Sequence, residues 1–500
     1  MIARRIKIIT MNITRVFLLF TCFVCFNMHI KAQSDLMTGD LNRIVVFARF
    51  NGDPEFDESR SYYDNFFNGS VSSVQSYFNA ISNGKLTVNS LIFPVGSSIS
   101  TSFELKYCFY CYETDWAKDF PICKGSDISS LTDISIGFII KDLVLKIGTT
   151  IDAGTDIDKN NDGIVDNFVI VLRGSGRGLN QGVHSPQNGA ISDRYTNTNG
   201  LITLNGKTVK NYTIVYERNS LSTHCRFLLN SLGFPYLYRP RTLYPRPVGI
   251  WDPMDGPELS YPLVYNRWKY SAGKWIDNIP VIDRAGTYTL NSSDKAENNA
   301  YRINSPDPNE FYVLEYRNNS TLYEHSLPES GMIVYRVNSL QSGSVNEIPE
   351  NYIFRKNGTV TVPGDLQLAL FSNLNGRNNF NSSTNPAPFS SMGISQDISL
   401  SNITIEGTTL TFNVDNLPTS INPINKDDLQ VYPNPTSGII HFNGDFEQVT
   451  LTDITGKRLF VGNLLMEQAQ TFDMSKYGAG IYILELKKEN KIQKVKIIRY

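Results

Sequence analysis

Histidine is the side chain that most often ligates a catalytic zinc or transfers a proton near neutral pH. A zinc site on a helix needs two imidazoles four residues apart, because positions i and i+4 project from one helix face. It also needs a nearby carboxylate to accept a proton from the metal-bound water. No two histidines in this sequence are four apart; they are His29, His184, His224, His325 and His441. The chain therefore has no H-E-x-x-H helix.

The segment around His224 nevertheless has the outline of such a helix. Residues 222–232 are predicted to form a buried helix, which Gly233-Phe234-Pro235 ends and an aromatic loop follows. The turn sequence Val248-Gly249-Ile250-Trp251-Asp252-Pro253-Met254-Asp255-Gly256 comes next. This order resembles the core of secreted zinc peptidases of the immune inhibitor A type (peptidase family M-six), in which a helix with H-E-x-x-H runs into L-G-[LF]-P-D-L-Y and a G-x-W-D-x-M turn.

The resemblance places other residues where the peptidases have their catalytic ones. The two histidines fall on Arg226 and Asn230, the glutamate on Phe227, and the acidic residue after the proline on Tyr236. A guanidinium repels a cation, a phenyl ring carries no proton, and a carboxamide oxygen suits zinc poorly. We therefore expect no catalytic residue and no catalytic zinc at these four positions.

Segments on both sides extend the resemblance. The predicted strand 44–50, the Phe-Phe segment 62–68 and the predicted helix 73–86 look like the start of the same peptidase domain. Strands predicted between residues 286 and 337 resemble the β-rich region that accompanies these peptidases. The resemblance implies an α+β fold, with a zincin-like α/β domain followed by a β-rich, sandwich-like domain.

The C-terminal segment contains four short motifs among alternating strands. Together they look like the C-terminal sorting domain of proteins exported by the type IX secretion system, which implies passage through a Gram-negative outer membrane and that machinery as a partner. The motifs are Val431-Tyr432-Pro433-Asn434-Pro435, Asp453-Ile454-Thr455-Gly456-Lys457, Gly478-Ala479-Gly480-Ile481-Tyr482 and the basic strand 494–498.

The whole chain is expected to divide at changes in composition. We predict a signal peptide at 1–32, a metallopeptidase-like domain at 33–275, a β-rich domain at 276–416, a Pro/Asn/Ser linker at 417–426 and a small all-β sorting domain at 427–500. The first segment has a basic start and a short apolar run, as secretory signals do. Its removal takes away five basic residues and no acidic ones, so the net charge falls from −2 to −7. That balance argues against nucleic acid as a partner.

Four cysteines remain after the predicted signal peptide: Cys108, Cys111, Cys123 and Cys225. An even number in an exported chain favours disulfides, although plain thiols remain an alternative and the sequence does not decide which cysteines pair.

One loop has the spacing of a calcium site. Asp158, Asn160, Asp162 and Asp166, with the carbonyl of Ile164, match D-x-[DN]-x-D-G-x-x-D around a turn-making glycine. Ca²⁺ prefers six to eight oxygen ligands, and this spacing lets one tight turn supply several. The alternative is a solvated Asp/Asn turn that caps a strand; in either case the role is structural.

Three functions are compatible with these residues. The first is a secreted or surface pseudopeptidase, a monomer that binds a peptide or host protein through the peptidase scaffold. The second is an active metallopeptidase with an atypical metal site, for which His184, His224, Glu217 and Asp252 are the candidate ligands. The third is a surface adhesin whose segment 276–416 binds glycan or host protein.

Overall fold

The computed structural model describes residues 36–50, 53–95, 103–105, 133–173, 187–238, 246–343, 348–418, 431–442, 446–453, 457–463, 471–488 and 491–500. The described residues divide into two compact units, of which the first ends at Asn416 and the second contains the C-terminal segment from Leu417. The predicted signal peptide and most of the predicted linker lie outside the described residues.

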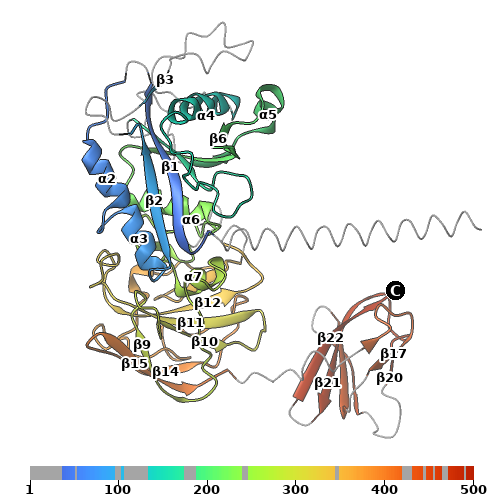
Figure 1. Ribbon diagram of the computed structural model, residues 1–500. Helices are drawn as coiled ribbons and strands as arrows, with labels where there is room; N and C mark the ends of the chain where they lie inside the picture. The colour runs from blue at the N-terminus through green and yellow to red at the C-terminus, as the bar shows by residue number, and fades with distance from the viewer. Residues whose placement is uncertain are drawn as a thin grey trace, which may run out of the picture. The chain divides into compact units, whose positions relative to one another are not determined.

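A mixed sheet lies at the centre of the N-terminal part of the first unit (Figure 1). Its strand order is β2-β1-β4-β8-β5, and short β3 extends β1 at one end. All neighbours pair in parallel except β5, an edge strand antiparallel to β8. The strands are β1 (Gly39–Phe50), β2 (Leu86–Phe93), β3 (Phe103–Leu105), β4 (Phe168–Leu172), β5 (Gln187–Ala190) and β8 (Asn211–Tyr216).

Helices cover both faces of this sheet, which explains why its central strand β4 is apolar at every position. Alternate residues of the strands point into two separate hydrophobic clusters. One cluster includes residues of α2 (Arg60–Asn68), α3 (Val74–Ile81) and α6 (Leu221–Ser231). The other includes residues of α4 (Asp133–Ile147) and α5 (Asp193–Asn199). A two-stranded ribbon, β6 (Thr203–Leu204) and β7 (Lys207–Thr208), precedes β8.

The rest of the first unit is β-rich. The turn η4 (Gly249–Trp251) and helix α7 (Val264–Tyr270) lead into a four-stranded sheet, β10-β11-β12-β13, and a three-stranded sheet, β14-β15-β9. The short η5 (Leu366–Leu368) lies between β13 and β14 in sequence. The strands are β9 (Gly286–Asn291), β10 (Ala300–Asn304), β11 (Glu310–Arg317), β12 (Gly331–Asn338), β13 (Asn351–Ile353), β14 (Ser399–Glu406) and β15 (Thr409–Asn416).

One hydrophobic core joins the α/β part to the β-rich part. The cluster that contains Val45 and Leu228 also contains Trp275, Val313 and Tyr335. Residues on both sides of the predicted boundary at 275 therefore pack together, in one compact unit. The boundaries proposed from the sequence stay predictions.

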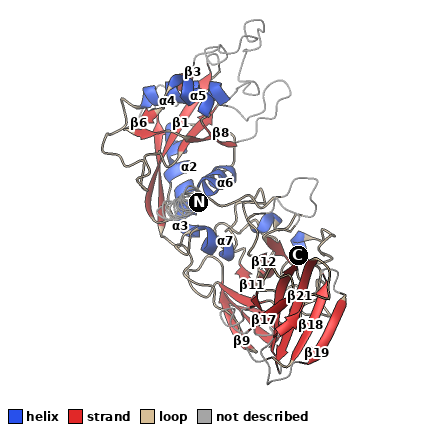
Figure 2. Cartoon of the chain, turned by 90° about the vertical axis from the view of Figure 1, so that its right-hand side faces the viewer, coloured by secondary structure: helices blue, strands red, loops and turns tan. Residues whose placement is uncertain are grey.

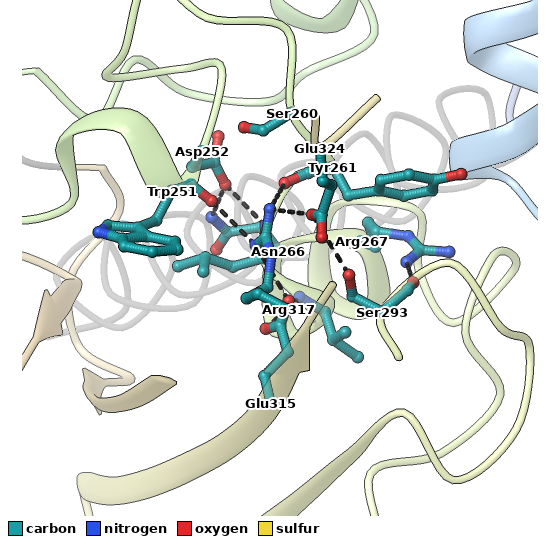
Figure 3. A network of polar contacts seen from close by, with 12 residues as sticks. Trp251, Asp252, Ser260, Tyr261, Asn266, Arg267, Ser293, Glu315, Arg317 and Glu324 are labelled. Atoms are coloured by element: carbon teal, nitrogen blue, oxygen red, sulfur yellow. Dashed lines mark hydrogen bonds and ion pairs between the residues drawn. The ribbon is translucent and has the colours of Figure 1, made fainter. Parts of the chain in front are cut away.

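A buried polar network reinforces this junction (Figure 3). Arg317 on β11 forms ion pairs with Glu315 and Glu324, and also donates to the carbonyl oxygens of Trp251 and Tyr261. Both glutamates and the arginine are almost fully buried, so each depends on the others for compensation of its charge.

The second unit consists of two sheets and has no helix among its described residues (Figure 2). The sheets have the orders β16-β17-β20 and β19-β18-β21-β22, and their inner faces share a cluster that includes Ile440, Leu451 and Leu484. The strands are β16 (Val431–Tyr432), β17 (Ile439–Phe442), β18 (Gln448–Asp453), β19 (Arg458–Asn463), β20 (Thr471–Asp473), β21 (Gly480–Lys488) and β22 (Lys491–Arg499).

The predicted mixed, strand-rich fold with an all-β C-terminal domain is confirmed. The finer assignment of residues 33–275 to a zincin-like fold stays a prediction.

Candidate functional site

Helix α6 forms where the sequence predicts it. The Ser220 hydroxyl accepts a hydrogen bond from the backbone N–H of Thr223 and caps the first turn. Gly233 ends the helix with φ of +95°, and the amide of Phe234 donates to the carbonyl of Leu229 in a Schellman arrangement. Because its buried side chains face the sheet, the helix holds its remaining side chains in fixed positions.

The residues at the peptidase-like positions make structural contacts. Arg226 donates to the carbonyl oxygen of Gly256 at 2.6 Å, in the turn that follows η4. The amide of Asn230 donates to the carbonyl of Phe234 at 3.1 Å, and its oxygen accepts from Asn188 at 2.9 Å. Phe227 and Tyr236 bring their rings together, with centroids 6.4 Å apart.

Asn188 ties the edge strand β5 to this helix. Its amide donates to the Phe227 carbonyl at 3.0 Å as well as to Asn230, and its oxygen accepts from the Thr213 hydroxyl at 2.6 Å. A cavity of about 340 Å³ lies beside these contacts and is lined by residues of β5, β8 and the end of α6. Of the four peptidase-like positions, Asn230 therefore lines a polar cleft next to an edge strand.

Two candidate ligands of the atypical metal site, Glu217 and His224, line one larger cavity of about 410 Å³. This cavity lies at the carboxyl ends of β1, β4 and β8. The strand order changes direction between β1 and β4, because β2 lies on one side of β1 and β4 on the other. Ligands bind at such positions in many α/β sheets. The Glu217 carboxylate already accepts from the Tyr63 hydroxyl at 3.0 Å and the Asp57 amide at 2.6 Å. It also forms an ion pair with Arg173.

His224 is 97% buried and packs edge-on against Phe66 and Phe67, with ring centroids 5.1 and 5.3 Å away. Its Nδ1 has no hydrogen-bond partner. Burial, and secondarily the charge of Arg43, lowers the pKa of His224 to about 3, so the imidazole is neutral at physiological pH.

Asp252, the third candidate, is elsewhere. Its carboxylate accepts from the backbone amides of Met254 and Leu263 and from the side chain of Asn266, each at 2.9 Å (Figure 3). Burial raises the pKa of Asp252 to about 6 despite these bonds. The structure thus brings His224 and Glu217 to one cavity, leaves Asp252 in the turn, and does not describe His184.

The predicted calcium loop folds around its own backbone and a lysine. Asp158 is 99% buried and accepts from the amides of Asp162 and Gly163 and from the ammonium of Lys207 at 2.7 Å. Burial favours the protonated form, but these hydrogen bonds hold the pKa of Asp158 below its usual value.

The remaining loop positions also contact the loop itself. The side-chain amide of Asn160 donates to the Asp162 carboxylate, and the backbone N–H of Ile164 donates to the same carboxylate. Asp166 has one oxygen without a partner, and burial raises the pKa of this carboxyl group to about 7. Calcium binding stays a prediction.

Cys225 is a buried free thiol on α6, so the expectation of disulfides among all four cysteines is wrong for this residue. Burial raises its pKa, which makes the thiol unreactive. Cys108, Cys111 and Cys123 lie outside the described residues.

Two further findings apply to the described part of the chain. No three or more His, Cys, Asp and Glu side chains gather there in a way that could hold a metal ion. No helix there is long and apolar enough to cross a membrane.

Sequence motifs do not reveal three further residues at or next to these cavities: Tyr63, Arg173 and Asn188. Each bonds to a residue 25 to 154 positions away, so no local motif reveals its role. Only the strand order brings these side chains together.

The comparisons with known proteins identify the C-terminal unit. Residues 430–499 match the family described as secretion system C-terminal sorting domain. No curated protein matches the chain. One similar solved structure is that of PorZ, described as an essential bacterial surface component of the type-IX secretion system of Porphyromonas gingivalis. The two chains are 12% identical with a TM-score of 0.14, and the match covers 40% of this chain and 38% of PorZ. The second unit is therefore a type IX sorting domain, and the protein is secreted or held at the cell surface.

Proposed function

We propose that the first unit is a pseudopeptidase: a zinc-peptidase scaffold that binds extended peptides without hydrolysing them. The observation that carries the proposal is the set of contacts at the peptidase-like positions of α6. Arg226 is bonded to the neighbouring turn, and Asn230, which lines the 340 Å³ cleft, is bonded to β5, so both side chains at the histidine positions are engaged in structural contacts.

The edge strand beside this cleft supplies the means of binding. β5 pairs with β8 on one side, and among the described residues no strand pairs with its other side. The amide of Ile191 donates to the Lys210 carbonyl of the neighbouring strand connection. Because backbone groups alternate in direction along a strand, those of Asn188 and Ala190 point away from β8. An extended peptide could pair with them without any metal.

The zincin-like ancestry of the scaffold is part of this proposal and rests on the sequence resemblance. The parallel sheet, the helix that directly follows β8 and the antiparallel edge strand support it by placing α6 and β5 side by side. Neither an atypical metal site nor glycan binding by residues 276–416 has a supporting contact among the described residues; both stay predictions.

A backbone substitution tests the proposal. Ala190→Pro removes one outward N–H and leaves the inward hydrogen bonds of β5 in place, whereas Ala190→Thr keeps the amide and serves as the matched control. The probe is a mixture of unstructured peptides from a casein digest, incubated with the immobilised full chain, with and without chelator.

The wild type and Ala190→Thr are expected to retain peptides intact in both conditions, and Ala190→Pro to retain at least several-fold less. Equal retention by Ala190→Pro would rule out pairing at this strand. Chelator-sensitive cleavage of the peptides would instead support the atypical metallopeptidase.

A further inference from the structure

Among the described residues of the first unit, four arginines are fully buried: Arg43, Arg267, Arg317 and Arg355. Three of them are held by acceptors. Arg317 has two glutamates, Arg267 donates to two carbonyls and an asparagine, and Arg355 donates to four carbonyls. This is the usual way in which a protein compensates a buried charge.

Arg43, on β1, is the exception. It is 98% buried, and its Nε and Nη1 atoms have no hydrogen-bond partner. Among the described residues no carboxylate forms an ion pair with it; instead its guanidinium lies 5.7 Å from the centroid of the Phe67 ring. A ring face compensates a buried cation only partly, so the guanidinium lacks a counter-ion.

The surroundings of Arg43 suit an anion. Ser90 is its register partner on β2, is 94% buried, and has a hydroxyl with no hydrogen-bond partner. Phe67, whose ring centroid lies 5.7 Å from the Arg43 guanidinium, also lines the 410 Å³ cavity, and so does His224, on which the charge of Arg43 acts. The ring of Phe67 thus contacts both the guanidinium and the cavity.

We propose that Arg43, with the hydroxyl of Ser90, binds a small monovalent anion beneath the cavity at the carboxyl ends of the parallel strands. The anion is either a halide or the carboxylate of an organic molecule whose apolar body lies against the aromatic walls formed by Tyr62, Phe66 and Phe67. This inference does not depend on the proposed peptide binding, which concerns a different cleft.

Thermal unfolding of the full chain tests the site, because a ligand that binds only the folded state raises the unfolding temperature. Sodium bromide and sodium benzoate are compared with sodium gluconate at constant ionic strength, since gluconate is too large and polar for a buried site. The variants are Arg43→Met, which removes the charge and keeps the length, and Arg302→Met as control, because Arg302 is a half-buried arginine that also lies over a ring, that of Phe311.

Bromide or benzoate is expected to raise the unfolding temperature of the wild type and Arg302→Met by several degrees, and to leave Arg43→Met unchanged. A larger effect of benzoate identifies an organic carboxylate as the ligand, and a larger effect of bromide identifies a halide. Should Arg43→Met not fold, bromide anomalous scattering from wild-type crystals provides the second test, with a peak expected beside Arg43. Unfolding temperatures that are equal in all three salts, anion dependence that persists in Arg43→Met, or no peak beside Arg43 would overturn the proposal.

Discussion

Replacement of His224 by phenylalanine should make the first unit more resistant to acid. The imidazole lies among aromatic rings and has its pKa lowered to about 3, against an ordinary value of 6.5. A histidine whose pKa is depressed by folding has no effect on stability above pH 6.5, where it is neutral in both states. As the pH falls from 6.5 toward 3, only the unfolded chain binds the proton, so the folded state loses stability.

The size of the effect follows from the same two values. At pH 4.5 the unfolded chain has bound a proton that the folded chain has not, and two pH units below 6.5 correspond to about 3 kcal/mol of lost stability. His224→Phe removes this loss and keeps the edge-on contacts with Phe66 and Phe67. All other titrating groups are common to both proteins, so the difference between them isolates His224.

Urea unfolding at pH 7 and pH 4.5, followed by tryptophan fluorescence, measures this difference. All four tryptophans lie before residue 417, so the fluorescence reports on the first unit. His325→Phe is the matched control, because it makes the same substitution at an exposed histidine. If His224→Phe loses as much stability as the wild type between the two pH values, His224 titrates normally and the description of it as a neutral core residue is incorrect.

Three other outcomes are expected. Asn188→Ala removes three hydrogen bonds between β5, β8 and α6 and should cost about 1–3 kcal/mol in urea unfolding, whereas the exposed Gln187→Ala should cost little. Arg317→Met leaves Glu315 and Glu324 buried without a counter-ion and should cost about 3–5 kcal/mol. The control is Lys295→Met, which breaks the ion pair of the exposed Lys295 with Asp294 and should cost at most about 1 kcal/mol. If the 158–166 loop binds Ca²⁺, calcium at ten times its Kd should stabilise the chain by about 1.4 kcal/mol, and Asp162→Ala should abolish this; no stabilisation by millimolar calcium would favour the solvated turn.

Local patterns in the sequence were sufficient for much of the fold. The apolar run 168–172 lies within a residue of β4, because a parallel strand buried on both faces is a continuous apolar segment. The strands predicted at 310–317 and 331–337 lie within a residue of β11 and β12. The helix ended by Gly233 was predicted correctly because its stop depends on one glycine with positive φ. The sorting domain was recognised from its motifs and is confirmed.

Other features depend on contacts between distant residues. The edge strand β5 has the sequence Gln-Asn-Gly-Ala, which has no strand pattern, and its pairing with β8 determines its conformation. Helix α7 buries Arg267, a residue that a sequence pattern would place at the surface; its acceptors on Ile81 and Ser293 come from distant segments. The free thiol of Cys225 likewise follows from its packing in the core and not from the number of cysteines.

The proposed pseudopeptidase function requires that α6 presents Arg226, Phe227 and Asn230 where the immune inhibitor A-type peptidases have their catalytic residues, and that the chain binds peptides without cleaving them. The most direct test is the zinc content of the purified full chain, measured together with casein cleavage in the presence and absence of chelator. The claim predicts no stoichiometric zinc and no cleavage in either condition. One tightly bound zinc ion per chain, with cleavage that the chelator abolishes, would contradict it.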